Sequence, residues 1–257
     1  MRTILALFIV GLIFSGCMKE IITTNNQTTE NSKISSLIPL YINPTDFDEN
    51  TKEVLQHIVD NTEETISIIN PNSGPGDEMS QNYVDFIKEL HNMNSKVIGY
   101  VATGYAQKNL DDIKSEIDKY SQFYSLDGIF FDETDISNAK NNDQYKELAS
   151  YVRSKGYDIV AVNAGTKVPQ EFIDENIYDI VLTFENTYER FKEFNENENS
   201  SSTVSKQSIL IHGFDPTDDK QEVIDKCEAL DYKYIYITID GEDNPWDSLY
   251  DFIPDNQ

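Results

Sequence analysis

The sequence has 257 residues, a length that suits one barrel-sized domain or two smaller ones. It contains 46 acidic and 20 basic residues, which gives a formal net charge of −26. This charge repels the phosphate backbone of nucleic acids and anionic membrane surfaces, so we expect no nucleic-acid partner. Adaptation to high salt is another source of acidity, but the basic residues are nearly all Lys, and Ile and Asn are abundant, which disfavours it.

The N-terminal part has the composition of a targeting segment followed by a linker. Residues 4–14 are apolar, too few for a helix across a bilayer about 30 Å thick, and small residues precede Cys17. We predict a signal peptide over 1–16 and a lipidated Cys17, although Phe14 stands where such sites usually have Leu. Residues 17–36 are predicted to form a flexible polar tether. The expected location is outside the cytoplasm, lipid-anchored to the membrane surface, with secretion as the alternative.

Cys227 is the other cysteine of the sequence. With Cys17 attached to lipid, no disulfide can form, so stability must come from a packed core. We expect Cys227 to be a small buried apolar side chain.

Short apolar runs alternate with amphipathic segments from residue 37 onward. The strand-like runs are 37–42, 65–70, 96–102, 128–131, 158–163, 180–184, 208–212 and 234–239. The helical segments are 49–64, 81–93, 110–124, 143–154, 169–176, 188–194 and 219–230, with 246–252 as a short eighth. This alternation favours a parallel sheet, so we predict an α/β fold with a single (β/α)8 TIM-type barrel over residues 37–257. A doubly wound open sheet is the alternative.

One polar residue stands at or just past the end of each predicted strand. These residues are Asn43, Asn70, Thr103, Asp132, Asn163, Glu185, His212 and Asp240. A closed barrel brings the carboxyl ends of all its strands to one rim. The pattern therefore favours the barrel and predicts that these side chains line a single pocket.

Asp132, Glu133 and Glu185 supply the carboxyl groups that hydrolysis of a glycosidic bond requires. One carboxylate must attack or stabilise the anomeric carbon, and one protonated acid must donate to the departing oxygen. Successive strand residues point to opposite sides, so we expect Asp132 to face the pocket and Glu133 to lie just beyond the strand. Crowded like charges raise at least one pKa, which keeps an acid protonated near neutral pH. The alternatives are a helix cap for Asp132 and a solvated loop position for Glu185.

Aromatic side chains near the strand ends suit the apolar C–H faces of sugar rings. Tyr41, Tyr100 and Tyr105 are predicted to form such a platform, and each also has a plausible core position. Trp246 follows the last strand and either covers the pocket or anchors the last helix. The other predicted substrate contacts are Asn70, Thr103, Asn163, His212 and Asp240.

We predict no metal site and no cofactor. His57, His91 and His212 fall in unrelated elements without metal-ligand spacing, which also disfavours a metal-dependent deacetylase. The sequence has no Gly-rich phosphate loop and no GxSxG motif, which counts against nucleotide and serine-hydrolase chemistry.

An ordered set of segments matches a known family. The segments are Ile38-Pro39-Leu40-Tyr41, Asn70 to Gly76, Gly99 to Tyr105, Asp127 to Glu133, and Phe184-Glu185. Over residues 37–252 the chain resembles the spherulin-4-like family, most specifically in its Asn-Pro-Asn-Ser-Gly-Pro-Gly loop and its Asp-Gly-Ile-Phe-Phe-Asp-Glu strand. Known members are (β/α)8 enzymes of glycoside hydrolase family 135 that cut α-1,4-linked galactosamine or N-acetylgalactosamine polymers within the chain.

The resemblance implies an endo-acting exopolysaccharide hydrolase with Asp132, Glu133 and Glu185 at the family's functional acids. By likeness to barrel glycosidases acting on α-galactosides, we expect Asp132 to be the nucleophile or charge stabiliser and Glu185 the acid/base. Ala164 stands where we expect Pro, but Asn163 remains. The expected partner is an amino-sugar polymer, attracted by the acidic protein, with membrane contact through the lipid only. The alternative is a non-catalytic surface module that binds carbohydrate, although retention of all three acids favours the enzyme. The oligomeric state stays open.

Overall fold

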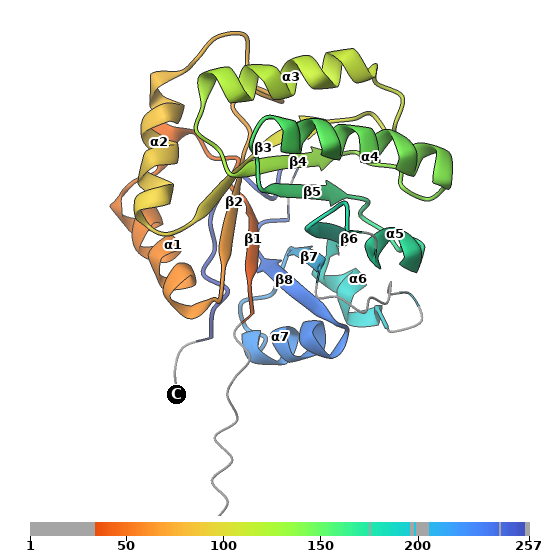
Figure 1. Cartoon of the computed structure of the whole chain (residues 1–257). Coiled ribbons are helices and arrows are strands. Elements are labelled where there is room, and N and C mark those ends of the chain that lie inside the picture. Colours follow the sequence, from red (N-terminus) through yellow and green to blue (C-terminus); the bar gives the residue numbers. More distant parts are fainter. Residues whose placement is uncertain (1–33, 175, 196–197, 199–205, 242, 255–257) are drawn as a thin grey trace, which may run out of the picture. The chain divides into compact units, whose positions relative to one another are not determined.

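Eight parallel strands form a closed barrel in the computed structural model of the protein (Figure 1). The strands are β1 (Ser36–Pro39), β2 (Thr65–Ile69), β3 (Lys96–Ala102), β4 (Gly128–Asp132), β5 (Ile159–Asn163), β6 (Ile180–Thr187), β7 (Gln207–His212) and β8 (Tyr232–Ile237). Each strand pairs with the next along the chain. Ser35 closes the ring against β8, because its N–H donates to Lys233 O at 3.0 Å and its carbonyl oxygen accepts from Ile235 N at 2.9 Å. The predicted TIM-type barrel is confirmed, and the open-sheet alternative is wrong.

The structure describes residues 34–254 except 175, 196–197, 199–205 and 242. The predicted signal peptide, Cys17 and the tether as far as residue 33 lie outside this range. Ser36, predicted to end the tether, already begins β1. Within the described range, no helix is both long enough and apolar enough to cross a membrane.

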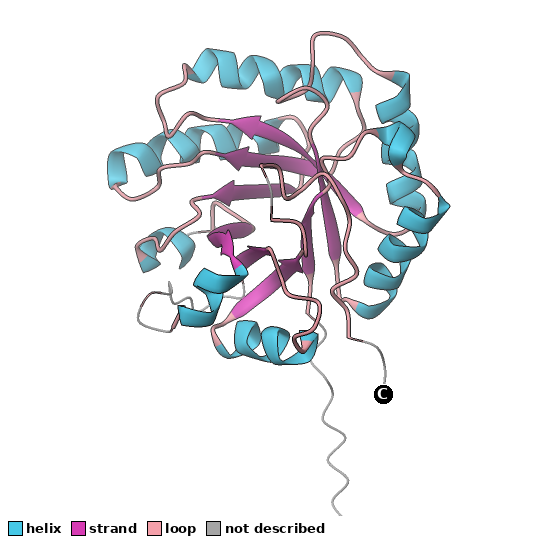
Figure 2. Cartoon of the chain, turned by 180° about the vertical axis from the view of Figure 1, so that it is seen from behind, coloured by secondary structure: helices cyan, strands magenta, loops and turns pink. Residues whose placement is uncertain are grey.

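Helices surround the barrel (Figure 2). They are the 3-10 helix η1 (Pro44–Asp46) and the α-helices α1 (Glu49–Asn61), α2 (Gln81–Asn92), α3 (Leu110–Phe123), α4 (Ala139–Ser154), α5 (Gln170–Asp174), α6 (Tyr188–Glu193) and α7 (Lys220–Ala229). Among the described residues, none follows β8, so the predicted eighth helix over 246–252 is wrong. Tertiary hydrogen bonds hold this segment without a helix: Tyr41 N donates to Trp246 O at 3.0 Å, and Tyr250 N donates to the Tyr236 hydroxyl at 3.1 Å.

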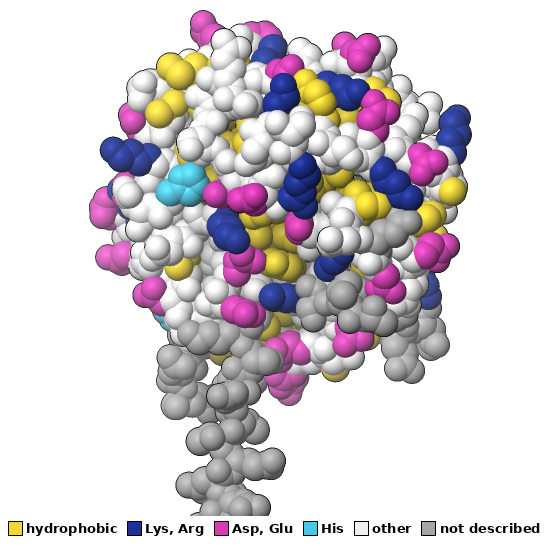
Figure 3. Space-filling model, in the orientation of Figure 1, with side chains coloured by type: hydrophobic (Ala, Val, Ile, Leu, Met, Phe, Trp, Pro, Cys, Tyr) yellow, Lys and Arg dark blue, Asp and Glu magenta, His cyan; other side chains and the backbone are white. Residues whose placement is uncertain are grey.

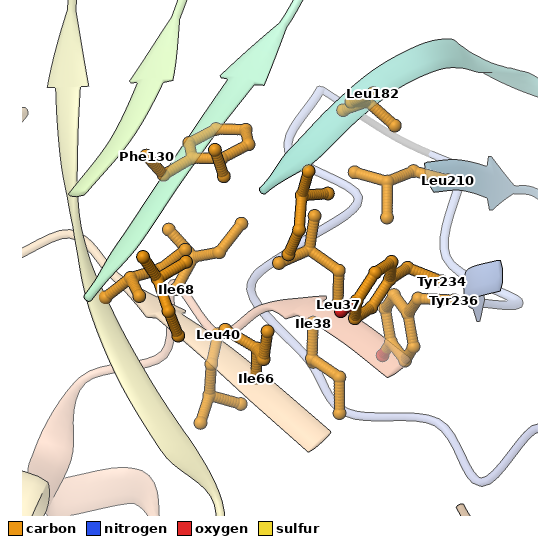
Figure 4. Close-up of a cluster of buried hydrophobic side chains, with 14 of the residues drawn as sticks. Leu37, Ile38, Leu40, Ile66, Ile68, Phe130, Leu182, Leu210, Tyr234 and Tyr236 are labelled. Carbon is orange, nitrogen blue, oxygen red and sulfur yellow. The ribbon is translucent and has the colours of Figure 1, made fainter. Parts of the chain in front are cut away.

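The centre of the barrel is packed with apolar side chains from strands far apart in the sequence (Figure 4). Phe130 of β4 lies in this cluster, together with Leu182 of β6 and Leu210 of β7. Phe131 points outward instead, with its ring 6.5 Å from the ring of Tyr145 in α4. Strand β4 is therefore buried on both faces, and its alternation determines where the next residue points.

Cys227 is a free, fully buried thiol in α7, as predicted. Its burial raises the pKa of the thiol, so the side chain is unreactive and contributes to the packing of the core.

Charged side chains are scattered over the outside of the barrel. Acidic and basic side chains are interspersed over the face shown in Figure 3. Several basic residues are paired, for example Lys114 with Glu147 at 2.5 Å and Lys119 with Asp77 at 3.0 Å. The negative net charge therefore comes from the acidic residues that exceed the number of basic ones.

Candidate active site

Asp132 is the last residue of β4 and points toward the interior of the barrel mouth. The outward packing of Phe131 and the inward position of Phe130 determine this direction, because side chains alternate along a strand. Glu133 follows with a φ of 52°, a left-handed conformation that is uncommon outside glycine. The chain thus leaves the strand at Glu133, which lies just beyond β4.

Asn163 at the end of β5 joins Asp132 to Glu185. Its Nδ2 atom donates one hydrogen to Asp132 Oδ1 at 2.7 Å and the other to Glu185 Oε2 at 2.6 Å. These two carboxylate oxygens are therefore at most about 5.3 Å apart, the sum of the two lengths. Asn163 Oδ1 is buried without a hydrogen-bond partner. The amide group that we predicted to contact substrate thus uses both hydrogens to hold two acids side by side.

Glu185 lies inside β6 and not past its end, because β6 is longer than the sequence predicts. The register of β6 against β7 shifts between Leu182 and Phe184, and such a bulge changes the direction of the side chains that follow. Trp246 Nε1 donates to Glu185 Oε1 at 3.1 Å. Both oxygens of this carboxyl group are therefore held by neutral N–H donors.

The environment of Glu185 favours its protonated form. Burial raises the pKa of Glu185 above its ordinary value, the hydrogen bond from Asn163 lowers it, the Asp132 charge raises it, and the bond from Trp246 lowers it. The net direction is upward. This carboxyl group therefore keeps a proton at pH values where an exposed Glu is ionised, as a general acid must.

Two tyrosine rings form the wall of the site next to Asp132. The rings of Tyr41 and Tyr100 meet edge to face, with centroids 5.8 Å apart and an interplanar angle of 84°. Burial raises the pKa of both hydroxyl groups, and the charges of Asp132 and Glu185 raise it further. Both groups therefore stay protonated at neutral pH beside the Asp132 carboxylate.

Thr103 and Tyr105 follow β3 but have opposite environments. Thr103 is fully buried, and its hydroxyl contacts Asp132 O at 3.0 Å, Glu133 O at 2.8 Å and the Tyr145 hydroxyl at 2.8 Å. Thr103 therefore holds the end of β4 in place and does not face the opening as predicted. Tyr105 is 61% exposed, and its N–H donates to Glu133 O at 2.6 Å. It presents its ring to solvent, a position open to a bound ligand.

His212 at the end of β7 stands beside Trp246, with the ring centroids 6.0 Å apart. Burial lowers the pKa of His212, with Asp240 acting in the opposite direction, so the ring is neutral at pH 7. Its Nδ1 atom is buried and has no hydrogen-bond partner. Asp240, past β8, accepts from Ser248 Oγ at 3.3 Å.

Asn70 shapes a loop. Its Oδ1 atom accepts from Gly74 N at 2.9 Å, so its side chain stabilises the turn after β2. In that turn Gly74 and Gly76 have φ values of 138° and 80°, which a side chain rarely tolerates. The loop sequence is thus explained by backbone geometry, and the substrate contact predicted for Asn70 stays a prediction.

The described part of the chain contains no group of three or more His, Cys, Asp or Glu side chains arranged to hold a metal ion. His57 and His91 belong to pairs away from the site, with Asp251 at 2.7 Å and Asp127 at 2.9 Å.

Comparison with known proteins identifies the family of this barrel. Residues 35–255 match the model of Spherulin4, the spherulation-specific family 4. The chain belongs to this family. Spherulin-4 of Physarum polycephalum is 31% identical over 148 residues, which cover 56% of this chain and 43% of that one. The alignment thus spans less than half of that relative. The crystal structure of Aspergillus clavatus Sph3 in complex with GalNAc superposes with a TM-score of 0.69 and 25% identity, covering 81% of this chain and 90% of that one.

In this Spherulin4-family protein, the sequence left the role of Trp246 undecided. The structure brings its indole N–H onto Glu185, although 61 positions separate them. A single Trp after a Gly-Glu-Asp-Asn-Pro loop was the available signal, and it did not say which acid the ring would meet.

Proposed function

We propose that this protein is an endo-acting glycoside hydrolase that cuts a polymer of α-1,4-linked galactosamine or N-acetylgalactosamine. The observation that carries the proposal is the single amide group that holds Asp132 and Glu185 together at the barrel mouth. Two carboxyl groups of different environment, facing one another, are what glycosidic cleavage requires.

Asp132 is the nucleophile in this proposal and Glu185 the acid/base. Glu185 gives its proton to the departing glycosidic oxygen while Asp132 attacks the anomeric carbon, and a covalent glycosyl-enzyme forms. Glu185 then takes a proton from water, which displaces Asp132 and releases the sugar. The limit of about 5.3 Å between the nearest oxygens supports this route. Retaining enzymes place the carboxyl groups about 5 to 5.5 Å apart, whereas inverting enzymes need about 6.5 to 9.5 Å.

Two observations support an amino-sugar substrate. The protein is similar to Sph3, whose structure contains GalNAc, over most of both chains. The formal charge of −26 attracts a polymer with free, protonated amino groups. That attraction weakens with salt, because the screening length falls from about 10 Å at 0.1 M to about 3 Å at 1 M.

The test is incubation of the purified protein with a panel of acetylated and deacetylated amino-sugar polymers, followed by mass analysis of the oligomers. We expect internal cleavage of the α-1,4-galactosaminan and first-formed products with the α configuration by NMR. Separate Asp132→Asn and Glu185→Gln variants should lose turnover, and full activity in either removes that residue's role. Binding of the polymer without release of oligomers would favour the non-catalytic carbohydrate-binding module.

We also propose that the protein is lipid-anchored at the cell surface through Cys17. A Cys17→Ser variant should then leave the membrane fraction of the producing cell. If the wild-type protein is already found in the medium, secretion without a lipid is the better description.

A further inference from the structure

Trp246 is held firmly on its own side of the barrel. It is 6% exposed, and its carbonyl oxygen accepts from the N–H of Tyr41 just after β1. Its ring lies edge-on to His212, and 6.1 Å separates its centroid from that of Tyr236. The backbone of Trp246 is therefore held by Tyr41, and its ring is packed between His212 and Tyr236.

The indole N–H is directed toward Glu185. The indole nitrogen lies 3.1 Å from Oε1, while Asn163 occupies Oε2 at 2.6 Å. A carboxyl group held at both oxygens cannot rotate without losing one of these bonds. Asn163 alone would leave the group free to turn about the Oε2 contact, so Trp246 supplies the second fixed point.

We propose that Trp246 is a positioning residue that orients the Glu185 carboxyl group for proton transfer through its indole N–H. The proposal rests on the function proposed above. Trp246 is then part of the catalytic apparatus, although it contributes no acid.

Removal of this donor has a predictable direction. The hydrogen bond from Trp246 stabilises the ionised carboxylate, so its loss should raise the pKa of Glu185 further. The other groups that act on Glu185 stay unchanged: the Asp132 charge, the Asn163 amide, and the protonated Tyr41 and Tyr100 hydroxyls. Neutral His212 faces the Trp246 ring and adds no charge at pH 7.

The first experiment is the pH profile of kcat/KM for Trp246→Phe, which keeps a flat ring and removes the N–H. We expect kcat at the optimum to fall about tenfold, KM to change less than twofold, and the alkaline limb to move to higher pH. The control is Phe252→Leu, which loosens the packing against Tyr236 and removes no hydrogen-bond donor to Glu185. It should lower Tm and leave the profile unchanged. A Trp246→Phe profile that superimposes on the wild type overturns the proposal.

The second experiment does not require activity. Trp246 is the only tryptophan of the chain, so its fluorescence reports its own environment. Titration of the wild type from pH 3 to 9 should show a transition that disappears in Glu185→Gln, while any contribution of His212 remains. Titration curves of the wild type and Glu185→Gln that superimpose overturn the coupling of Trp246 to Glu185. If the transition that depends on Glu185 is present but the protein cleaves no polymer, the proposed function is wrong and the coupling of Trp246 to Glu185 is still supported.

Discussion

Carboxylates at the two ends of the barrel are held by different kinds of partner. Just before β4, at the amino ends of the strands, Asp127 accepts from Val97 N at 2.7 Å and pairs with His91 at 2.9 Å. Asp179, just before β6, accepts from a backbone N–H of β5 at 2.7 Å and forms an ion pair with Arg153. Each acid thus ties one strand to the next and has a basic side chain beside it.

At the carboxyl ends, the acids have neutral partners. Asn163 donates to both Asp132 and Glu185, Trp246 donates to Glu185, and in the described structure neither acid forms an ion pair. A neighbouring cation stabilises the carboxylate and makes it a poor proton carrier, whereas neutral donors fix orientation at a smaller cost to proton affinity. The same residue types therefore stabilise the scaffold at one end and, in the proposed function, transfer a proton at the other.

The largest expected effect comes from exchanging one carboxylate at each end for its neutral isostere. Asp132→Asn should lower kcat/KM by about 10³-fold or more, because the proposed nucleophile is lost. Asp127→Asn should leave kcat/KM unchanged and lower the free energy of unfolding by about 1 kcal/mol, since this acid is partly exposed. Kinetics and urea denaturation of both variants measure the two effects. Comparable losses of kcat/KM in the two variants would contradict the separate roles of the acids at the two ends of the barrel.

Asn163→Asp tests whether the partner between the two acids must be neutral. The new carboxylate adds a third negative charge beside Asp132 and Glu185 and loses at least one donor, so we expect activity at pH 7 to fall by about 100-fold. Part of the loss should be recovered at lower pH, where the new group is protonated and donates one hydrogen. The measurement is the ratio of variant to wild-type kcat/KM from pH 4 to 8. A ratio independent of pH would mean that charge at this position does not matter.

The third prediction concerns stability and pH. Burial and the Asp132 charge raise the pKa of Glu185 above its ordinary 4.5, so ionisation is harder in the folded chain than in the unfolded one. The stability from this group is complete below the unfolded-state pKa and is lost as pH rises through the higher folded-state pKa. Denaturation from pH 4 to 8 should therefore show the wild type losing stability relative to Glu185→Gln as pH rises. A difference between the two that stays constant would show that the folded-state pKa is not raised.

Much of the fold could be predicted because its signals are local. Apolar runs such as 128–131 mark strands buried on both faces, and their alternation with amphipathic segments predicts the barrel. The strand order then brings Asp132 and Glu185 to one mouth, where the structure has them. Strand alternation also predicted that Asp132 faces the pocket and that Glu133 lies just beyond the strand.

What could not be predicted depends on contacts between distant segments. The bulge in β6 before Glu185 is a shift in how β6 pairs with β7. The pairing involves two separate segments, so the sequence around Glu185 alone does not predict it. Thr103 has the polarity of a pocket residue, but its hydroxyl is used by the backbone at the end of β4. The missing eighth helix has the same origin, because hydrogen bonds to Tyr41 and Tyr236 replace those of a helix.

The smallest expected effect concerns the exposed rim, where Tyr105 should contribute to polymer binding alone. Gly104, Tyr105 and Ala106 have φ values of 58°, 54° and 62°, a left-handed run that costs roughly 1–2 kcal/mol for each residue with a side chain. Tyr105→Gly should relieve that strain. The glycine also raises the conformational entropy of the unfolded chain, which lowers the stability by about 0.5–1 kcal/mol. The variant should therefore be as stable as the wild type or slightly more stable.

The lost ring should raise KM for the polymer about fivefold and leave kcat unchanged, because a stacked aromatic is worth about 0.5–1.5 kcal/mol. Ala106→Gly is the control: it relieves the same kind of strain and removes no ring, so its KM should equal that of the wild type. Stability from denaturation and KM on long and short oligomers separate the two contributions. If Tyr105→Gly binds polymer as well as Ala106→Gly does, the Tyr105 ring takes no part in substrate binding.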